Sequence, residues 1–466
     1  MILYHIQEGD AMSTPDVLAT AASEAVGNPY LEGNFAPVRT ETTAIDLPVH
    51  GQIPEALEGR LVRIGPNPLG PLDARTYHWF MGSGLVHGLR LKGGKAEWYR
   101  SRFVVSDSIA RALGRPPLPG PRNGSGNNTA NTNVVEMGGR TYAIVEAGGL
   151  PVELTYNLES VARSDLGGTL VHGFSAHPKF DPATGELHVL TYQPGLEALS
   201  YLVVDRNGRS RSVADIAAPH CPMVHDVAFT ATRIIVLDLP VTFDRAGVGK
   251  GFPFAWNAER APRIGLLPRN GDLAGLRWIE APSCYVFHVM NAFDEEGAVV
   301  IDVVRHPRMF DRERRGPSEG DPQLVRWRID PASGRLCQIM LEERGCEFPR
   351  FNDAFGGRAY RYGYTVSAGG VQEFGPTFKH DATTGRTEVH DYGGGRSALE
   401  PVFVAREGAT AEDEGWVMSY VYDGERNATD VVILDAQCFS APPVATISLP
   451  VRVPFGFHGN WLPDPV

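Results

Sequence analysis

The chain has 466 residues and a formal net charge of −12, with 42% hydrophobic and 21% charged residues. A chain of this composition can build a large core, which excludes an intrinsically disordered protein. Its acidic balance, with Arg residues grouped only in the mixed-charge segment 312–319, also argues against a nucleic-acid-binding protein.

The sequence predicts a mobile leader over residues 1–30, followed by one domain over residues 31–466. Its 52 Gly and 36 Pro residues form no low-complexity tract, so they mark many turns between short strands. A short helix is expected over residues 106–113, with Ser106 as its cap. Three further segments begin with Asp and close with Gly, as hairpin tips do. They are residues 181–185, 330–334 and 381–385.

Repeated antiparallel hairpins predict an all-β fold. Since no helical pattern separates successive strands, a doubly wound α/β fold is excluded. The hairpins alone leave two candidate architectures, a β-propeller and a pair of β-sandwiches.

No segment of the sequence predicts a membrane-spanning helix or a secretory signal. The best apolar runs, residues 233–239 and 298–304, each contain an Asp and fall far short of ~18 residues. The first ten residues lack the basic and apolar regions of a signal peptide, and Met1 and Met12 are both candidate start positions. Five cysteines without CxxC spacing fit reduced thiols. We therefore expect a cytoplasmic protein.

Four histidines share a local setting, with an apolar residue shortly before and a turn or polar residue soon after: His177, His225, His288 and His458. Separations of 48, 63 and 170 residues are too wide for a local zinc motif. They suit ligands that come from the inner ends of different propeller blades and meet on the axis. Four neutral imidazoles favour Fe, Cu, Zn or Ni over Mg or Ca. Any one of them alone would more commonly be an ordinary, partly buried histidine.

Three glutamates lie in similarly apolar or turn-rich settings: Glu146, Glu347 and Glu400. A metal-bound histidine usually donates its second N–H to a carboxylate or a carbonyl. Each of these glutamates is therefore a candidate partner of a ligating histidine, although a lone one is more commonly a salt-bridge partner at a strand end.

Several short motifs accompany these positions in order along the chain: Asn34–Pro37, Leu57–Arg60, Gly65–Pro68, Gly82–His87 and Ala130–Asn133. Together with the histidine and glutamate contexts, they resemble the carotenoid cleavage oxygenase family, in a bacterial member. The resemblance extends from about residue 28 to residue 463.

The resemblance implies a seven-bladed β-propeller, with loops and short helices forming a dome over an axial metal site. It implies one non-haem Fe(II) per chain, held by His177, His225, His288 and His458, with Glu146, Glu347 and Glu400 bonded to three of the imidazoles. Which glutamate serves which histidine is open. The implied reaction adds O2 across one C=C bond of an alkene and gives two carbonyl products, without a catalytic side chain beyond the metal centre.

The residue before the first of these glutamates bears on the substrate. The stilbene-cleaving branch of the family has a Lys there, which meets a phenolic hydroxyl, whereas this chain has Val145. We therefore expect a small apolar alkene, a carotenoid or an apocarotenoid. The alternative is the same cleavage of a phenolic stilbenoid or phenylpropene such as resveratrol, lignostilbene or isoeugenol. Candidate tunnel residues are Val145, Phe103, Phe254, Trp256, Phe287, Phe351 and Phe374.

A carotenoid must leave a bilayer to enter the protein, so peripheral contact with the inner membrane face is one expectation. Residues 103–118 and 251–256 could form an apolar patch at the entrance, or simply pack within the dome. A calcium-dependent propeller hydrolase fits less well, because it needs carboxylate ligands. A non-catalytic binding propeller would leave the histidines without a purpose. No protein partner is indicated.

Overall fold

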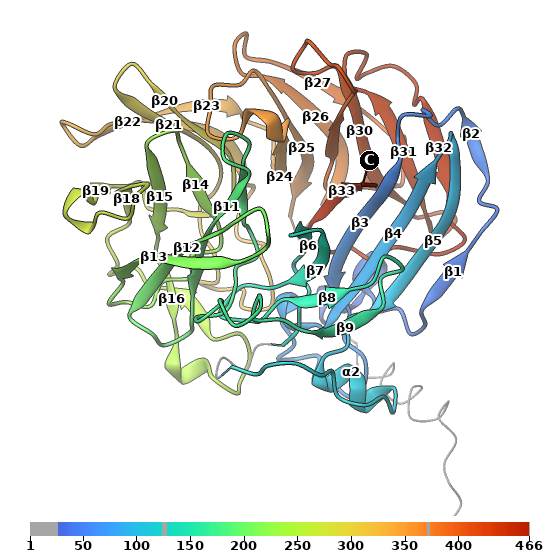
Figure 1. Cartoon of the computed structure of the whole chain (residues 1–466), viewed down its shortest axis with the longest axis horizontal. Helices are drawn as coiled ribbons and strands as arrows, with labels where there is room; N and C mark the ends of the chain where they lie inside the picture. The colour runs from blue at the N-terminus through green and yellow to red at the C-terminus, as the bar shows by residue number, and fades with distance from the viewer. Residues whose placement is uncertain (1–26, 124–127, 371–372, 466) are drawn as a thin grey trace, which may run out of the picture.

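Seven antiparallel sheets follow one another around a ring in the computed structural model, which describes residues 27–123, 128–370 and 373–465 (Figure 1). The sheets are the blades of a β-propeller, which confirms the expected architecture. Blade 2 consists of β6 (Asn133–Met137), β7 (Arg140–Ile144), β8 (Val152–Leu154) and β9 (Ser160–Arg163). Blade 3 consists of β10 (Lys179–Asp181), β11 (Glu186–Tyr192), β12 (Ala198–Val204) and β13 (Ser210–Ala217). Blade 4 consists of β14 (Val227–Phe229), β15 (Arg233–Asp238), β18 (Arg263–Pro268) and β19 (Arg277–Glu280).

Blades 5 and 6 repeat the four-stranded meander. They consist of β20 (Tyr285–Glu295), β21 (Ala298–His306), β22 (Gln323–Asp330) and β23 (Arg335–Glu342); and β24 (Cys346–Phe351), β25 (Tyr362–Gly369), β26 (Glu373–Asp381) and β27 (Arg386–His390). In blades 2 to 6 the first strand lies nearest the axis, and the inner strands β10, β14, β20 and β24 contact one another in that order.

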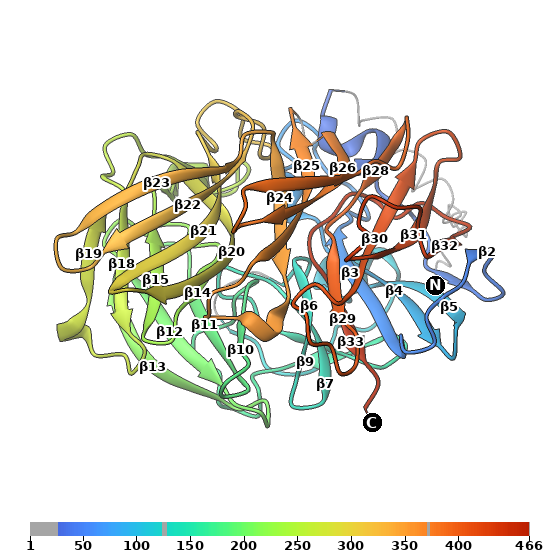
Figure 2. The ribbon, with the colours of Figure 1, turned by 90° about the horizontal axis from the view of Figure 1, so that it is seen from above.

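The two ends of the chain close the ring. Blade 1 contains β1 (Thr42–Ala44), β5 (Lys95–Phe103), β4 (Gly84–Lys92) and β3 (Gly59–Pro66), and its innermost strand is β33 (Gly459–Pro463) from the other end. Blade 7 contains β28 (Arg396–Ala398), β29 (Val402–Ala405), β30 (Gly415–Asp423), β31 (Ala428–Asp435) and β32 (Ala445–Ser448), and takes β2 (Val49–Gly51) as its outermost strand. β33 pairs with β3 and also contacts β29, and Figure 2 shows the three strands close together.

The buried fraction of the strands falls from the axis of the propeller outward. The residues of β21 are almost all buried, because this strand has a neighbouring blade on each face, whereas most residues of the outer strand β23 are exposed. The three expected hairpin tips are confirmed. Each closes with a glycine in the left-handed region, at φ 72° in Gly185 and Gly334 and 70° in Gly385.

Loops and short helices form the dome on one side of the ring. They include the expected helix, observed as α2 (Asp107–Ala112), in which the Ser106 hydroxyl accepts a hydrogen bond from the Ile109 amide. The hairpin of β16 (Val241–Phe243) and β17 (Phe254–Trp256) also belongs to the dome. The 3₁₀ turns are η1 (Pro29–Leu31), η2 (Gly33–Phe35), η3 (Trp79–Met81), η4 (Arg245–Gly247), η5 (Leu273–Gly275) and η6 (Asp353–Phe355).

Residues 1–26 of the expected leader lie outside the described residues. The described part of it is packed: the Asn28 side chain caps η1, and Tyr30 is 1% exposed. The division of the chain into a leader and one catalytic domain stays a prediction. Among the described residues, the longest helices are too short to cross a membrane.

Candidate metal centre

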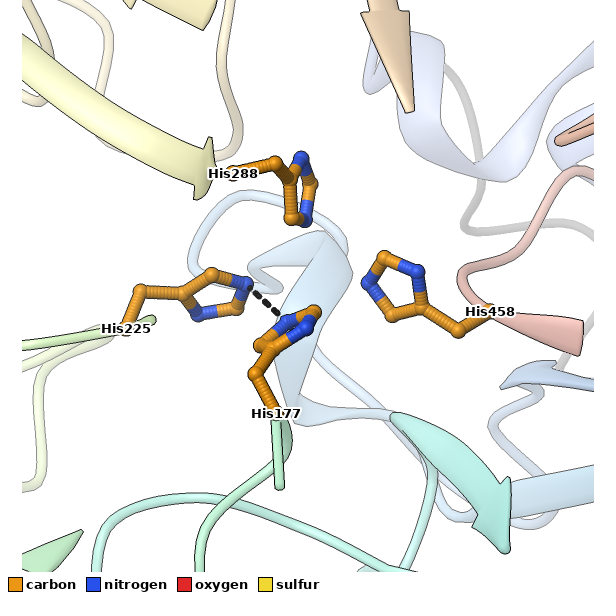
Figure 3. A group of neighbouring side chains, drawn as sticks. All are labelled: His177, His225, His288 and His458. Atoms are coloured by element: carbon orange, nitrogen blue, oxygen red, sulfur yellow. Dashed lines mark hydrogen bonds between the residues drawn. The ribbon is translucent and has the colours of Figure 1, made fainter. Parts of the chain in front are cut away.

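The four histidines singled out from the sequence meet on the propeller axis (Figure 3). All four are buried, and their potential ligand nitrogens lie within 4.8 Å of one another. His177 and His225 lie two residues before β10 and β14, His288 lies within β20, and His458 directly precedes β33. Each therefore comes from the inner strand of a different blade, as the spacing suggested.

Local irregularities in the strands aim these side chains at the axis. The pairing of β20 with β21 shifts register between Val286 and Val289 and again before Asn291, so the backbone bulges around His288. The approach of His458 depends on glycine, because a Cβ on Gly456 would lie 2.7 Å from the Cα of Gly65 in β3. Because Gly456 has no side chain, the segment before β33 can pass close to blade 1.

Three of the imidazoles each contact one glutamate, which answers the open question of pairing. The Glu146 carboxylate lies 3.0 Å from His225 Nδ1. Glu347 lies 2.6 Å from His288 Nδ1, and Glu400 lies 2.8 Å from His458 Nδ1. In the described part of the chain, no carboxylate reaches His177. With Nδ1 as the donor, each of the three paired imidazoles keeps its Nε2 lone pair for another ligand.

Each glutamate is itself held by a further polar group. The Tyr192 hydroxyl donates to Glu146 at 3.0 Å, and His306 Nε2 lies 2.9 Å from Glu347. The Gly459 amide donates to Glu400 at 2.7 Å. These bonds fix the carboxylates, which in turn fix the imidazole rings.

The charge states follow from burial and from these pairs. Burial, opposed in part by Glu400, lowers the pKa of His458 to about 4, and burial lowers that of His177 well below 6.5. Burial raises the pKa of a carboxyl, yet His458 and Arg350 outweigh it and lower that of Glu400 to about 2. At His225 the opposite balance holds, because Glu146 outweighs burial and raises the pKa.

The donor set fits a metal ion. The Nε2 atom of His288 is buried without a hydrogen-bond partner, although a buried polar nitrogen normally has one. The Nε2 atoms of His177 and His225 lie only 2.9 Å apart (Figure 3). Several imidazole nitrogens that converge on one buried point form the nitrogen-rich site that suits Fe, Cu, Zn or Ni.

An apolar cavity of about 430 Å³ reaches the histidines from the dome side. Among the tunnel candidates, Val145, Phe254, Phe287 and Phe374 line it. Phe103 does not, because it packs in a separate core with Leu85 and Ile109. Nor does Trp256, which packs under the Arg308 guanidinium. Phe351 turns away toward Tyr360, at 5.6 Å between ring centroids.

Several lining residues were missed from the sequence. They include the aromatic residues Trp79, Phe80, Tyr192, Phe243, Phe252, Phe348 and Phe457, and also His306. Two of them, Phe348 and Phe457, adjoin Glu347 and His458, so adjacency to a site residue was a usable signal, as it was for Val145 and Phe287. Trp79 and Phe80 come from a turn in blade 1, and no sequence signal connects that turn with the axis.

The large apolar side chains of the two segments considered as a membrane patch are buried or half-buried. Ile109 and Leu118 are 0% and 6% exposed, and Phe254 is 3% exposed and faces the cavity. At the cavity itself, Met81 and Val248 are the exposed large side chains, at 49% and 56%. The dome therefore packs these segments, and peripheral membrane contact stays a prediction.

Comparisons with known proteins agree with this architecture. The family model described as "Retinal pigment epithelial membrane protein" (RPE65) matches residues 35–463. A carotenoid cleavage oxygenase of Mycobacterium tuberculosis is 40% identical over 96% of this chain and 100% of that protein. An isoeugenol monooxygenase of Pseudomonas putida is 32% identical over 93% of this chain and 98% of that protein.

Two solved structures share the whole fold. The lignostilbene dioxygenase of Pseudomonas brassicacearum is 28% identical with a TM-score of 0.86, over 94% of this chain and 99% of that one. The cobalt-substituted apocarotenoid oxygenase of Synechocystis is 28% identical with a TM-score of 0.81, over 92% and 97%. Since the family model covers most of the chain and relatives match over nearly their full length, this chain belongs to the RPE65 family of carotenoid oxygenases.

Proposed function

We propose that the protein is a ferrous oxygenase that cleaves a C=C bond of a carotenoid or an apocarotenoid and releases two carbonyl products. One observation carries the proposal. Four buried histidines converge within 4.8 Å at the inner end of an apolar cavity. His177, His225, His288 and His458 would hold one Fe(II), and Glu146, Glu347 and Glu400 would orient three of the rings.

Bound iron supplies the position at which O2 is activated beside the alkene. The protein contributes geometry. Three carboxylate–imidazole pairs hold the ligand nitrogens in place, so the ion meets a preorganised site. The aromatic walls exclude water and fix which double bond lies next to the histidines. No side-chain acid or base is required beyond the metal centre. The outcome therefore depends on where the cavity places the double bond relative to the histidines.

The cavity lining supports a polyene over a phenol. Val145 lines the cavity at 3% exposure, where a Lys would meet a phenolic hydroxyl. Among the described lining residues there is no Lys or Arg, so no ammonium or guanidinium group is available in the cavity wall to stabilise a phenolate. The carboxylates of Glu146 and Glu347 face histidines, and their negative charge would repel a phenolate.

The test is product identification. The Fe(II)-loaded protein is exposed to air with β-carotene, a set of apocarotenals, resveratrol and isoeugenol, and the aldehydes are analysed by mass spectrometry. Apocarotenoid aldehydes of defined length would support the proposal and locate the scissile bond. Phenolic aldehydes alone would assign the cavity to the alternative substrate class. The matched control is His288→Ala, which we expect to lose iron and turnover together.

A further inference from the structure

A second cavity, of about 600 Å³, approaches the same histidines from the side opposite the substrate cavity. Residues from β6, β10, β14, β20, β24 and β33 line it, so it follows the propeller axis. Its exposed lining residues include Glu136, Phe180 and Asp353, which place its mouth at the surface. The activity proposed above makes no use of this cavity.

The histidines lie between the two cavities. His225 lines only the substrate cavity, His177 lines only the axial cavity, and His288 and His458 line both. Of the four, His177 is the imidazole that no carboxylate of the described chain reaches. The histidine that faces only the axial cavity is therefore the one without a carboxylate partner.

The two cavities differ in polarity. Six charged side chains line the axial cavity among its apolar residues, whereas only Glu146 and Glu347 are charged in the substrate cavity, which has aromatic walls. A divalent cation that crossed the aromatic walls would give up its hydration without compensation, which is costly in free energy. The carboxylates of the axial cavity offset part of this cost, because they attract the ion and accept hydrogen bonds from the water molecules around it.

The charges of the axial cavity favour a cation. Lys179 lies 2.9 Å from Asp226, and Arg350 lies 3.5 Å from Glu400, so each positive side chain is paired with a carboxylate. Glu136 and Asp353 remain as exposed negative charges at the mouth. A cleft with an excess of one charge raises the local concentration of the opposite ion and its rate of entry.

We propose that this axial cavity is the route by which a hydrated divalent metal ion reaches the four histidines, separate from the route of the alkene. Glu136 and Asp353 attract the ion at the mouth, the ion follows the cavity along the axis with its water molecules, and His177 receives it. This inference rests on the metal site of the proposed function. The separation lets the protein take up its metal without wetting the apolar cavity.

The test is the rate of Co(II) uptake by the metal-free protein, followed in a stopped-flow instrument by the visible absorption of the bound ion. We expect Glu136→Lys/Asp353→Lys to slow uptake about tenfold at low ionic strength, with the difference largely lost at about 0.5 M salt. The amount bound at the end should be unchanged, since neither residue contacts a histidine of the cluster. Glu136→Gln/Asp353→Asn should fall between the two rates.

The matched control is Glu197→Lys/Glu259→Lys, which changes the net charge equally at exposed positions outside the axial cavity. Glu197 lies three residues after Pro194, a lining residue of the substrate cavity, so the control also places a positive charge near that other cavity. We expect this control to take up Co(II) within twofold of the wild-type rate. Equal rates in all variants, or equal slowing in both Lys pairs, would overturn the axial route while leaving the metal site intact. Failure of the wild type to bind Co(II) would overturn the metal site as well.

Discussion

Replacing Glu347 by Gln is the most informative single change at the metal centre. The carboxylate of Glu347 is 7% exposed and contacts His288 Nδ1 at 2.6 Å and His306 Nε2 at 2.9 Å. A carboxylate accepts a hydrogen bond from both rings at once. Glutamine has one acceptor oxygen, so its NH2 group must face one imidazole, and that ring must then turn or change tautomer.

The size of the effect follows from the number of bonds disturbed. The His288 tautomer that presents Nε2 to a metal requires a proton on Nδ1, and Glu347 stabilises that proton as a full negative charge. Loss of such a partner typically costs 10- to 100-fold in metal affinity, or about 1.4 to 2.7 kcal/mol. We therefore expect E347Q to bind Fe(II) or Co(II) 10- to 100-fold more weakly.

The assay is a competition titration of the metal-free protein against a chelator of known affinity. Glu343→Gln is the matched control, because Glu343 lies four residues earlier, in the loop between β23 and β24, and is exposed and outside both cavities. It should bind as tightly as the wild type. Unchanged affinity in E347Q, with the fold intact by circular dichroism, would refute the role given to this carboxylate.

Three further predictions concern the cavity, the core and the axis. Val145→Lys places a charge in the apolar cavity and should lower kcat/KM for an apocarotenal at least about tenfold, while raising activity on a hydroxystilbene; loss on both substrates would contradict the role of this position. Burial lowers the pKa of His380 to about 4 from 6.5, so the folded state keeps it neutral while the unfolded chain takes up a proton. Stability should therefore fall by up to about 3 kcal/mol from this residue as pH drops from about 6.5 to 4. Urea unfolding of His380→Gln should show a correspondingly smaller acid loss, and an identical pH profile would disprove the assignment. Gly456→Ala should cost about 1–3 kcal/mol, because its Cβ would meet the Gly65 backbone. Gly394→Ala, with no atom within 4 Å of its Cβ, is the control, and equal unfolding midpoints would exclude the close approach as a constraint.

The sequence predicted the class of fold and the convergence of the four histidines, for physical reasons. Turn chemistry at Gly185, Gly334 and Gly385 marks hairpins locally, and a chain of hairpins has few stable arrangements. The four histidines were visible because each repeats the same local setting at the start of an inner strand. Their convergence could be inferred from propeller symmetry before any distance was known.

The pairing of glutamates with histidines could not be obtained from the sequence. Glu146 in blade 2 contacts His225 at the edge of blade 4, and this depends on how the blades are arranged around the axis. The cavity walls were only half predicted. Phe103 and Trp256 looked as suitable as Phe254, because whether an aromatic ring faces a cavity or a neighbouring sheet depends on tertiary packing.

The central claim is that the four-histidine cluster holds one ferrous ion and that this ion is required to cleave an alkene. Anaerobic titration of the metal-free protein with Fe(II), with initial rates of apocarotenal cleavage measured after each addition in air, tests it most directly. The account predicts a linear rise that stops at one equivalent per chain, and no rise in His288→Ala. Cleavage by the metal-free protein, or full activity in His288→Ala, would contradict it.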